Sequence, residues 1–179
     1  MRLDRFLAEL GSKKGAPGGG AAAALTGASG AALVEMVARL NDKRSKRASG
    51  SAEKAASMRV KMLGLIVKDV KAFGRIQKLY RVRKDKKGAW TDALKAGALV
   101  PLDICACCAS AARLAVKEKP RTSAWLESDR REALILLRAG FQSAALNVAV
   151  NLKGLTDHPG FTDRIEARIK KWQRKLPRS

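Results

Sequence analysis

Aromatic and histidine residues are scarce in this 179-residue sequence. Aromatic side chains make up 4% of it, and His158 is its single histidine. Proteins that bind single-stranded nucleic acid usually stack bases on several aromatic side chains, and this chain has few to offer. No Cys/His set has the spacing of zinc ligands either, so we expect no metal site. The apolar fraction is mostly alanine, with few β-branched runs, which favours an all-α protein.

Acidic residues are also few. Against 37 Lys and Arg there are 16 Asp and Glu, which gives a net charge of +21. One interpretation is a nucleic-acid-binding surface that neutralises phosphates. The other is a site for an anionic small ligand, or a basic surface that only keeps the protein soluble. The positive residues are scattered over 43–47, 68–87 and 164–175 and form no single motif, so nucleic acid is the less favoured partner.

The cysteine content is low and local. Cys105, Cys107 and Cys108 lie within four residues, as expected of reduced thiols in the core of a cytoplasmic protein. The first ten residues are charged and amphipathic, unlike a secretory signal. Residues 21–38 are long and uncharged enough to suggest a membrane span, but they are mostly Ala, Gly and Ser and include Glu35. We therefore expect no membrane association.

A glycine-rich entry to a helix dominates the N-terminal part of the chain. Pro17, Gly18, Gly19 and Gly20 precede a long Ala-rich segment, so they predict a loop that leads into a helix N-terminus. Free backbone N–H groups at such an end accept anions. Because Ala21 and the next residues replace the Gly-Lys-Ser/Thr of a nucleotide phosphate loop, that type of site is excluded. Small residues repeat along the helix and allow close approach of another backbone or a flat ligand.

Apolar periodicity predicts a single-domain bundle of about six helices. A chain of this length forms one compact domain with a sizeable core. The predicted helices span residues 2–11, 21–41, 52–82, 90–117, 128–152 and 164–176. Pro101 falls inside the fourth helix, where it removes a hydrogen bond and clashes with the carbonyl of Gly97. We expect a kink there, which frees carbonyls either to line a site or only to shape packing.

One carboxylate interrupts an apolar stripe of the third predicted helix. Asp69 occurs at a spacing of three and four residues among apolar side chains, which makes it the strongest candidate for a functional acid. A buried Asp is costly unless it is paired or used, and pairing with a Lys or Arg of a neighbouring helix is the alternative. The stripe consists of Met62, Ile66, Asp69, Phe73, Ile76 and Tyr80.

The fifth predicted helix carries polar residues at both ends. Ser128 or Asp129 is expected to cap its N-terminus, the latter in a capping-box spacing with Glu132. Asn147 and Asn151 lie four residues apart on one face, and buried Asn side chains must form hydrogen bonds. They are interpreted either as bridges between helices or as a recognition element for a polar heterocycle.

Several segments in order resemble one family of folate enzymes. FLAELGSKKGAPGGGAAAALTGASGAALVEMVARL, KDVKAF, LVPLD, SD before a helix and NVAVNLKGLTD occur in that order. Over residues 3–161 the chain resembles the cyclodeaminase/cyclohydrolase family, with residues 162–179 as a basic C-terminal helix. The resemblance implies an all-helical, homodimeric fold with a folate pocket, folate as the substrate, and no further cofactor.

Residues carried over from the resemblance form one candidate site. The glycine loop is Pro17 to Gly20, and the remaining matched positions are Asp69, Pro101, Ser128, Asp129, Asn147 and Asn151. Asp69, then Asp129, is the candidate catalytic acid/base. The glycine loop with Lys13, Lys14, Lys43 or Arg44 is the candidate site for the folate glutamate carboxylates, and Ser128 and both Asn residues are candidate substrate contacts.

The resemblance leaves two reactions open. One is hydrolysis of 5,10-methenyltetrahydrofolate to 10-formyltetrahydrofolate, which a stand-alone chain favours; the other is cyclisation of formiminotetrahydrofolate with release of ammonia. Each needs a carboxylate to steady a cation and to move a proton. A third possibility is a non-catalytic basic protein on the same fold that binds nucleic acid or an acidic partner.

Overall fold

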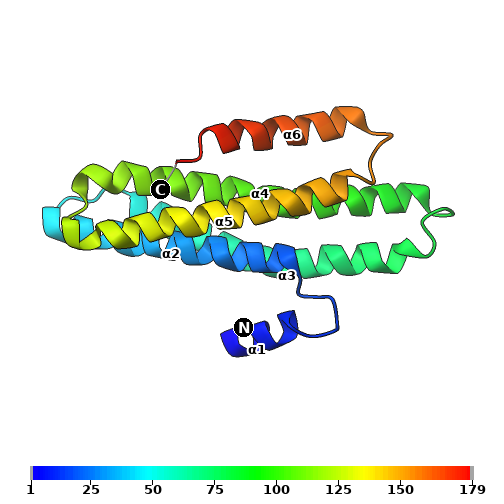
Figure 1. Cartoon of the computed structure of the whole chain (residues 1–179), viewed down its shortest axis with the longest axis horizontal. Helices are drawn as coiled ribbons and strands as arrows, with labels where there is room; N and C mark the ends of the chain where they lie inside the picture. The colour runs from blue at the N-terminus through cyan, green and yellow to red at the C-terminus, as the bar shows by residue number, and fades with distance from the viewer. Residues whose placement is uncertain (1, 178–179) are drawn as a thin grey trace.

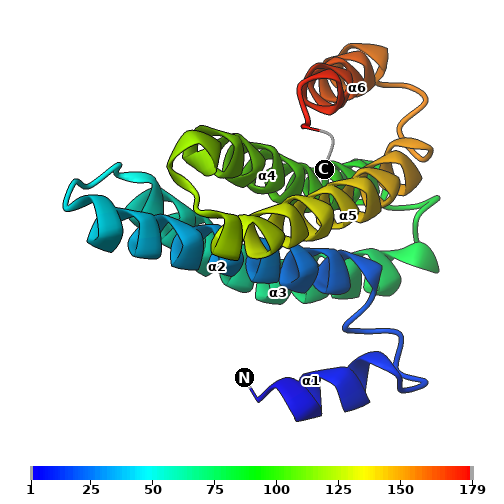
Figure 2. The same ribbon diagram turned by 60° about the vertical axis from the view of Figure 1, so that its left-hand side comes forward.

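The predicted all-α fold is confirmed. A computed structural model describes residues 2–177 and contains no strand in that range. Four long helices, each antiparallel to the next, form a bundle. A short helix lies on one side of it and the last helix on the other (Figures 1 and 2). The helices are α1 (Leu3–Leu10), α2 (Gly19–Ser45), α3 (Ser51–Tyr80), α4 (Lys87–Glu118), α5 (Glu127–Leu152) and α6 (Pro159–Arg174), with two short 3₁₀ turns between α4 and α5.

Local sequence accounts for both ends of α2 and for the start of α6. Gly18 is extended just before α2, and α2 ends where Lys46 takes a left-handed conformation with φ of 53°. The sequence placed the last helix at residue 164, but α6 begins at Pro159. Proline suits the first helical position because its missing N–H has no partner to lose there. The predicted start of this helix is therefore five residues too late.

Small residues let α2 and α5 pack closely. A Cβ on Gly140 of α5 would lie 3.0 Å from the backbone nitrogen of Gly27 in α2, so backbone meets backbone at this point. One turn further along α2, a Cβ on Gly30 would lie 2.7 Å from Leu137 Cγ. The alanine- and glycine-rich face of α2 thus serves helix packing over most of its length.

The cysteines lie in the core, as predicted. All three are buried free thiols on α4. Burial raises the pKa of Cys105 to about 12 and also raises that of Cys108. Cys108 packs against Met62 of α3, with sulfur atoms 3.9 Å apart. These thiols fill core volume and are poor nucleophiles.

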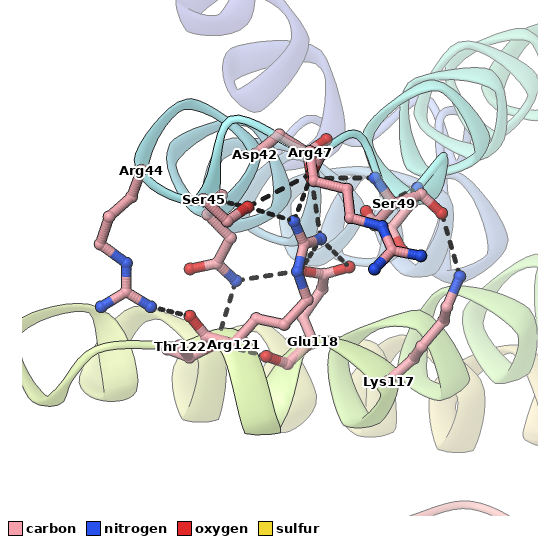
Figure 3. Close-up of polar contacts among 11 residues, drawn as sticks. Asp42, Arg44, Ser45, Arg47, Ser49, Lys117, Glu118, Arg121 and Thr122 are labelled. Atoms are coloured by element: carbon pink, nitrogen blue, oxygen red, sulfur yellow. Dashed lines mark hydrogen bonds and ion pairs between the residues drawn. The ribbon is translucent and has the colours of Figure 1, made fainter.

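A polar network fastens the end of the bundle where α2 turns into α3 (Figure 3). Asn41 Nδ2 donates to Glu118 Oε2 at 3.0 Å and to Thr122 Oγ1 at 3.2 Å. Arg121 bridges two carboxylates, 2.8 Å from Asp42 Oδ1 and 3.2 Å from Glu118 Oε2. Burial would raise the pKa of Glu118, but the hydrogen bond from Asn41 and the charge of Arg121 hold it below its ordinary value.

Candidate active site

A cavity of about 160 Å³ opens where α2 begins. It lies between the N-terminal loop of α2, the second half of α3, the first half of α4 and the end of α5. It brings together five glycines, one carboxylate and two side-chain amides from segments far apart in the sequence. Its lining consists of Gly15, Ala16, Gly18, Gly19, Gly20, Asp69, Val70, Ala72, Phe73, Ile76, Gly97, Asn147 and Asn151.

Asp69 fits against the first turn of α2 because Gly20 has no side chain. A Cβ on Gly20 would lie 2.6 Å from Asp69 Cγ and 2.8 Å from Oδ2, closer than any real side chain approaches. The backbone N–H of Ala21, one residue further on, stabilises the charged carboxylate. The anion-accepting end of α2 therefore faces a carboxylate of the chain itself.

Two opposing effects act on the acidity of Asp69. Burial raises the pKa of its carboxyl above the ordinary value, and the hydrogen bond from the Ala21 N–H partly offsets the increase. Asp69 takes part in none of the ion pairs formed within residues 2–177, so the alternative interpretation of a buried pair with Lys or Arg is wrong. The result is a half-buried carboxylate with a raised pKa, which suits a proton acceptor.

The two asparagines of α5 hold fixed orientations in the cavity wall. Asn147 Nδ2 donates to the carbonyl of Ser143 at 2.9 Å. Asn151 Nδ2 donates to two carbonyls, those of Asn147 at 2.9 Å and Gly97 at 3.2 Å. Because a carbonyl only accepts, these bonds determine which end of each amide is nitrogen. Asn151 therefore bridges two helices, which is the first of the two alternatives, and it also lines the cavity. Recognition of a polar heterocycle stays a prediction.

The polar side chains of this cavity are mainly acceptors. Asp69 supplies two carboxylate oxygens, and the amides of Asn147 and Asn151 each have an Oδ1 that accepts no hydrogen bond from residues 2–177. No Lys or Arg is among the lining residues. Such a cavity suits a flat cation or a ring edge that carries N–H donors, and it opposes an anion.

The predicted apolar stripe on α3 is buried over only half its length. Met62 and Ile66 are in the core, whereas Phe73 is 39% exposed and Tyr80 is 55% exposed. Helix α2 covers the stripe only as far as Asp69, because α3 extends past the first residue of α2 (Figure 1). The later stripe residues therefore face the cavity or solvent. This change of surroundings places the carboxylate at the boundary between core and cavity.

Four predicted site residues lie at the other end of the bundle. Lys43 and Arg44 are in the last turn of α2, and at 1.5 Å per residue Arg44 is roughly 36 Å from Gly20. Arg44 donates to the carbonyl of Arg121. Ser128 and Asp129 lie in the first turn of α5, about 27 Å along that helix from Asn147. Within one chain, none of the four reaches the cavity.

The predicted cap of α5 is wrong. The helix begins at Glu127, one residue before Ser128, and no side chain caps its end. Glu127 instead pairs with Arg130 one turn later, at 2.6 Å. Asp129 is left as an acidic residue in the first turn, where it complements the helix dipole.

Gly97 and Phe73 complete the cavity and were not predicted as site residues. The signal for Gly97 was present, since a glycine four residues before Pro101 marks both a freed carbonyl and a bare surface. Phe73 was recognised as apolar, but its spacing alone does not separate a core side chain from a cavity wall. Pro17 precedes the glycines and is buried beside the cavity.

The sequence matches one protein family and two relatives that are named as enzymes. A family model described as formiminotransferase-cyclodeaminase matches residues 2–171. A methenyltetrahydrofolate cyclohydrolase of Methylorubrum extorquens is 36% identical over 177 residues, covering 92% of this chain and 85% of that protein. A formimidoyltransferase-cyclodeaminase of Sus scrofa is 29% identical over 183 residues, covering 93% of this chain but 33% of the pig protein.

A solved structure shares the fold. The crystal structure of a formiminotetrahydrofolate cyclodeaminase from Thermotoga maritima superposes with a TM-score of 0.82 at 29% sequence identity. The match covers 98% of this chain and 93% of that one. The chain is thus similar in sequence and in structure to relatives named for the two reactions that the sequence left open.

Proposed function

Since the chain belongs to the formiminotransferase-cyclodeaminase family, we propose that it is an enzyme that hydrolyses 5,10-methenyltetrahydrofolate to 10-formyltetrahydrofolate. The observation that carries the proposal is the acceptor-lined cavity with Asp69 in its wall. The carbon between N5 and N10 of the substrate carries amidinium charge. A carboxylate and two amide oxygens stabilise that cation and accept from the N–H groups of the reduced pterin.

Asp69 is the residue proposed to move protons. Water adds through its oxygen to the amidinium carbon, and one water proton passes to the Asp69 carboxylate. The C–N5 bond then breaks, its electron pair goes to N5, and Asp69 returns the proton to that nitrogen. The second water proton leaves the adduct hydroxyl for solvent as the formyl C=O forms on N10. Asp69 ends as it began, and one proton is released for each turnover.

The hydrolytic reaction is favoured over formiminotetrahydrofolate cyclodeamination by the sequence identity of the relatives. The cyclohydrolase relative is 36% identical to this chain, whereas the pig formimidoyltransferase-cyclodeaminase and the Thermotoga maritima cyclodeaminase are each 29% identical to it. The test supplies each tetrahydrofolate derivative separately to the purified chain and follows methenyl absorbance and free ammonia. We expect rapid loss of methenyl absorbance and little ammonia. Rapid ammonia release instead assigns the second reaction, and turnover of neither substrate by the folded chain rejects both.

We also propose that the chain acts as a homodimer and that it does not associate with a membrane. By length and composition, α2, α4 and α5 are each apolar enough to cross a bilayer, although 56%, 56% and 39% of their most apolar windows are buried within the chain. Leu146 and Val150 on α5 are 70% and 67% exposed, and no charged residue occurs from 139 to 152. An uncharged face on a chain of net charge +21 suits a second copy. Sedimentation without detergent tests this proposal, and a monomer or a detergent-dependent particle contradicts it.

A reducing cytoplasm is the proposed location. The three buried cysteines are all free. Exported proteins more often pair their cysteines in disulfides. Fractionation of the native cells tests this proposal, and recovery from the exported fraction overturns it.

Nucleic-acid binding is a second candidate function, favoured by one surface. Lys68, Lys71, Arg75 and Lys78 are exposed and recur every three or four residues along α3, so they form a row of like charge. Such a row matches a phosphate backbone. Affinity for a random RNA or DNA oligonucleotide that falls steeply with salt supports this function. Absence of binding at low salt rejects it and leaves the row as a solvated surface.

A further inference from the structure

Pro101 leaves a carbonyl free inside α4, and an asparagine side chain on another helix donates a hydrogen bond to it. In an unbroken helix the N–H of residue 101 donates to the carbonyl of residue 97. Proline has no N–H, so the Gly97 carbonyl has lost this donor. Asn151 of α5 supplies the replacement, with Nδ2 donating to the Gly97 oxygen at 3.2 Å.

This contact fixes both ends of the Asn151 amide. Its two N–H groups have separate acceptors, the carbonyl of Gly97 and the carbonyl of Asn147 at 2.9 Å. The nitrogen therefore has no donor left for a ligand, and Oδ1 alone can interact with one. The Asn151 amide can come this close to α4 only because Gly97 has no side chain, since a Cβ there would lie 3.0 Å from Asn151 Oδ1.

We propose that Pro101 is a positioning residue for substrate recognition, acting through the Gly97 carbonyl to hold Asn151 as an obligate hydrogen-bond acceptor. Asn151 then selects a ring edge that presents an N–H donor and rejects one that presents a carbonyl or ring-nitrogen acceptor. The choice of reduced pterin as that ring rests on the proposed function. The locked orientation of the amide rests on the geometry of this chain alone.

Pro101→Ala separates this role from a structural one. Alanine restores the N–H at position 101, and closing the helical turn draws the Gly97 carbonyl back along the α4 axis, away from Asn151. Because alanine suits a helix interior better than proline, the melting temperature is expected to stay equal or to rise. The KM for methenyltetrahydrofolate is expected to rise about tenfold, as when one ligand hydrogen bond is lost, with kcat little changed.

Pro159→Ala is the matched control. Pro159 is at the start of α6, where no carbonyl one turn earlier in the helix awaits its N–H. Its replacement is expected to leave KM unchanged. A KM that rises equally in both variants, or in neither, overturns the proposal.

A double-mutant cycle with Asn151→Ala tests whether Pro101 acts through Asn151. In that background, Pro101→Ala should change KM by less than twofold, since the residue through which it acts is gone. A tenfold change that persists shows an independent effect and contradicts the proposal.

A readout without substrate distinguishes failure of this inference from failure of the proposed function. The side-chain amide protons of Asn151, assigned by NMR, should exchange faster with solvent in Pro101→Ala than in the wild-type chain. This follows from the loss of one of their two carbonyl acceptors. Unchanged exchange shows that Pro101 does not fix the orientation of the Asn151 amide, even if the chain hydrolyses methenyltetrahydrofolate. Faster exchange in a chain without activity supports the role of Pro101 in orienting Asn151 and overturns the proposed hydrolysis.

Discussion

The carboxylate of Asp69 lies at the start of α2, in the space that a side chain on Gly20 would fill. A Cβ added to Gly20 would be 2.6 Å from Asp69 Cγ. The conformational freedom of glycine is not the reason for its presence here, since Gly20 lies within the helix. The absence of a side chain is what brings an acid from α3 to the backbone N–H of Ala21.

Gly20→Ala is expected to displace Asp69 and reduce kcat/KM at least tenfold, since a small misplacement of a catalytic group is costly. Gly19→Ala is the matched control, because a Cβ there lies 3.6 Å from the Asn147 side-chain amide, an ordinary contact. Steady-state kinetics of the two variants check the prediction. Equal activity of Gly20→Ala and the wild-type chain shows that the position of Asp69 is not critical.

Removal of Arg121 is expected to destabilise the fold without affecting the site. Its loss leaves the fully buried Glu118 without a cationic partner, and breaking such a pair costs about 3 kcal/mol. The C-terminal end of α2 is far from the cavity, so kcat/KM per folded molecule should stay within twofold. Urea unfolding and kinetics of Arg121→Ala check both parts, and an unchanged free energy of unfolding would contradict the role of the network.

The same network predicts a loss of stability in acid. The pKa of Glu118 is lowered in the folded chain from its ordinary value of 4.5. Its contribution is therefore complete above pH 4.5 and is lost as the pH falls through the lowered, folded-state pKa. Glu118→Gln should flatten this part of a plot of melting temperature against pH. An equally steep acid limb in the variant means that other carboxylates cause it.

The native thiols are expected to resist modification. Cys105, with a pKa of about 12, and Cys108 are buried and remain protonated at neutral pH. A thiol-reactive disulfide reagent should react slowly with the folded chain and quickly with three thiols after denaturation. Fast reaction in the folded state would show that α4 opens.

Periodicity and composition predicted the fold well because helix-forming signals are local. All six helices were predicted, and the bounds of α2, α3 and α4 differ from prediction by four residues or fewer. The start of α6 was missed because Pro159 was not recognised as the first residue of a helix. Ser128 resembled a cap, yet the 3₁₀ turn before α5 continues directly into the helix at Glu127.

The site was only partly predictable, because distance along a chain does not give distance in space. Asp69 and both asparagines were singled out, and the fold brings them to one cavity. Lys43 was assigned to the same site as the glycine loop, but it lies at the far end of the 27-residue helix α2. Gly97 was missed because its role depends on Asn151, which is 54 residues away.

Asp69→Asn with methenyltetrahydrofolate as substrate tests the catalytic role of Asp69 most directly. The raised pKa means that ionised Asp69 costs stability above that pKa and none below its ordinary value of 3.8, so the amide should melt at an equal or higher temperature at neutral pH. Loss of a general acid/base should slow the decay of methenyl absorbance about 10²- to 10⁴-fold. A folded Asp69→Asn variant that hydrolyses methenyltetrahydrofolate at the wild-type rate would contradict the role assigned to Asp69.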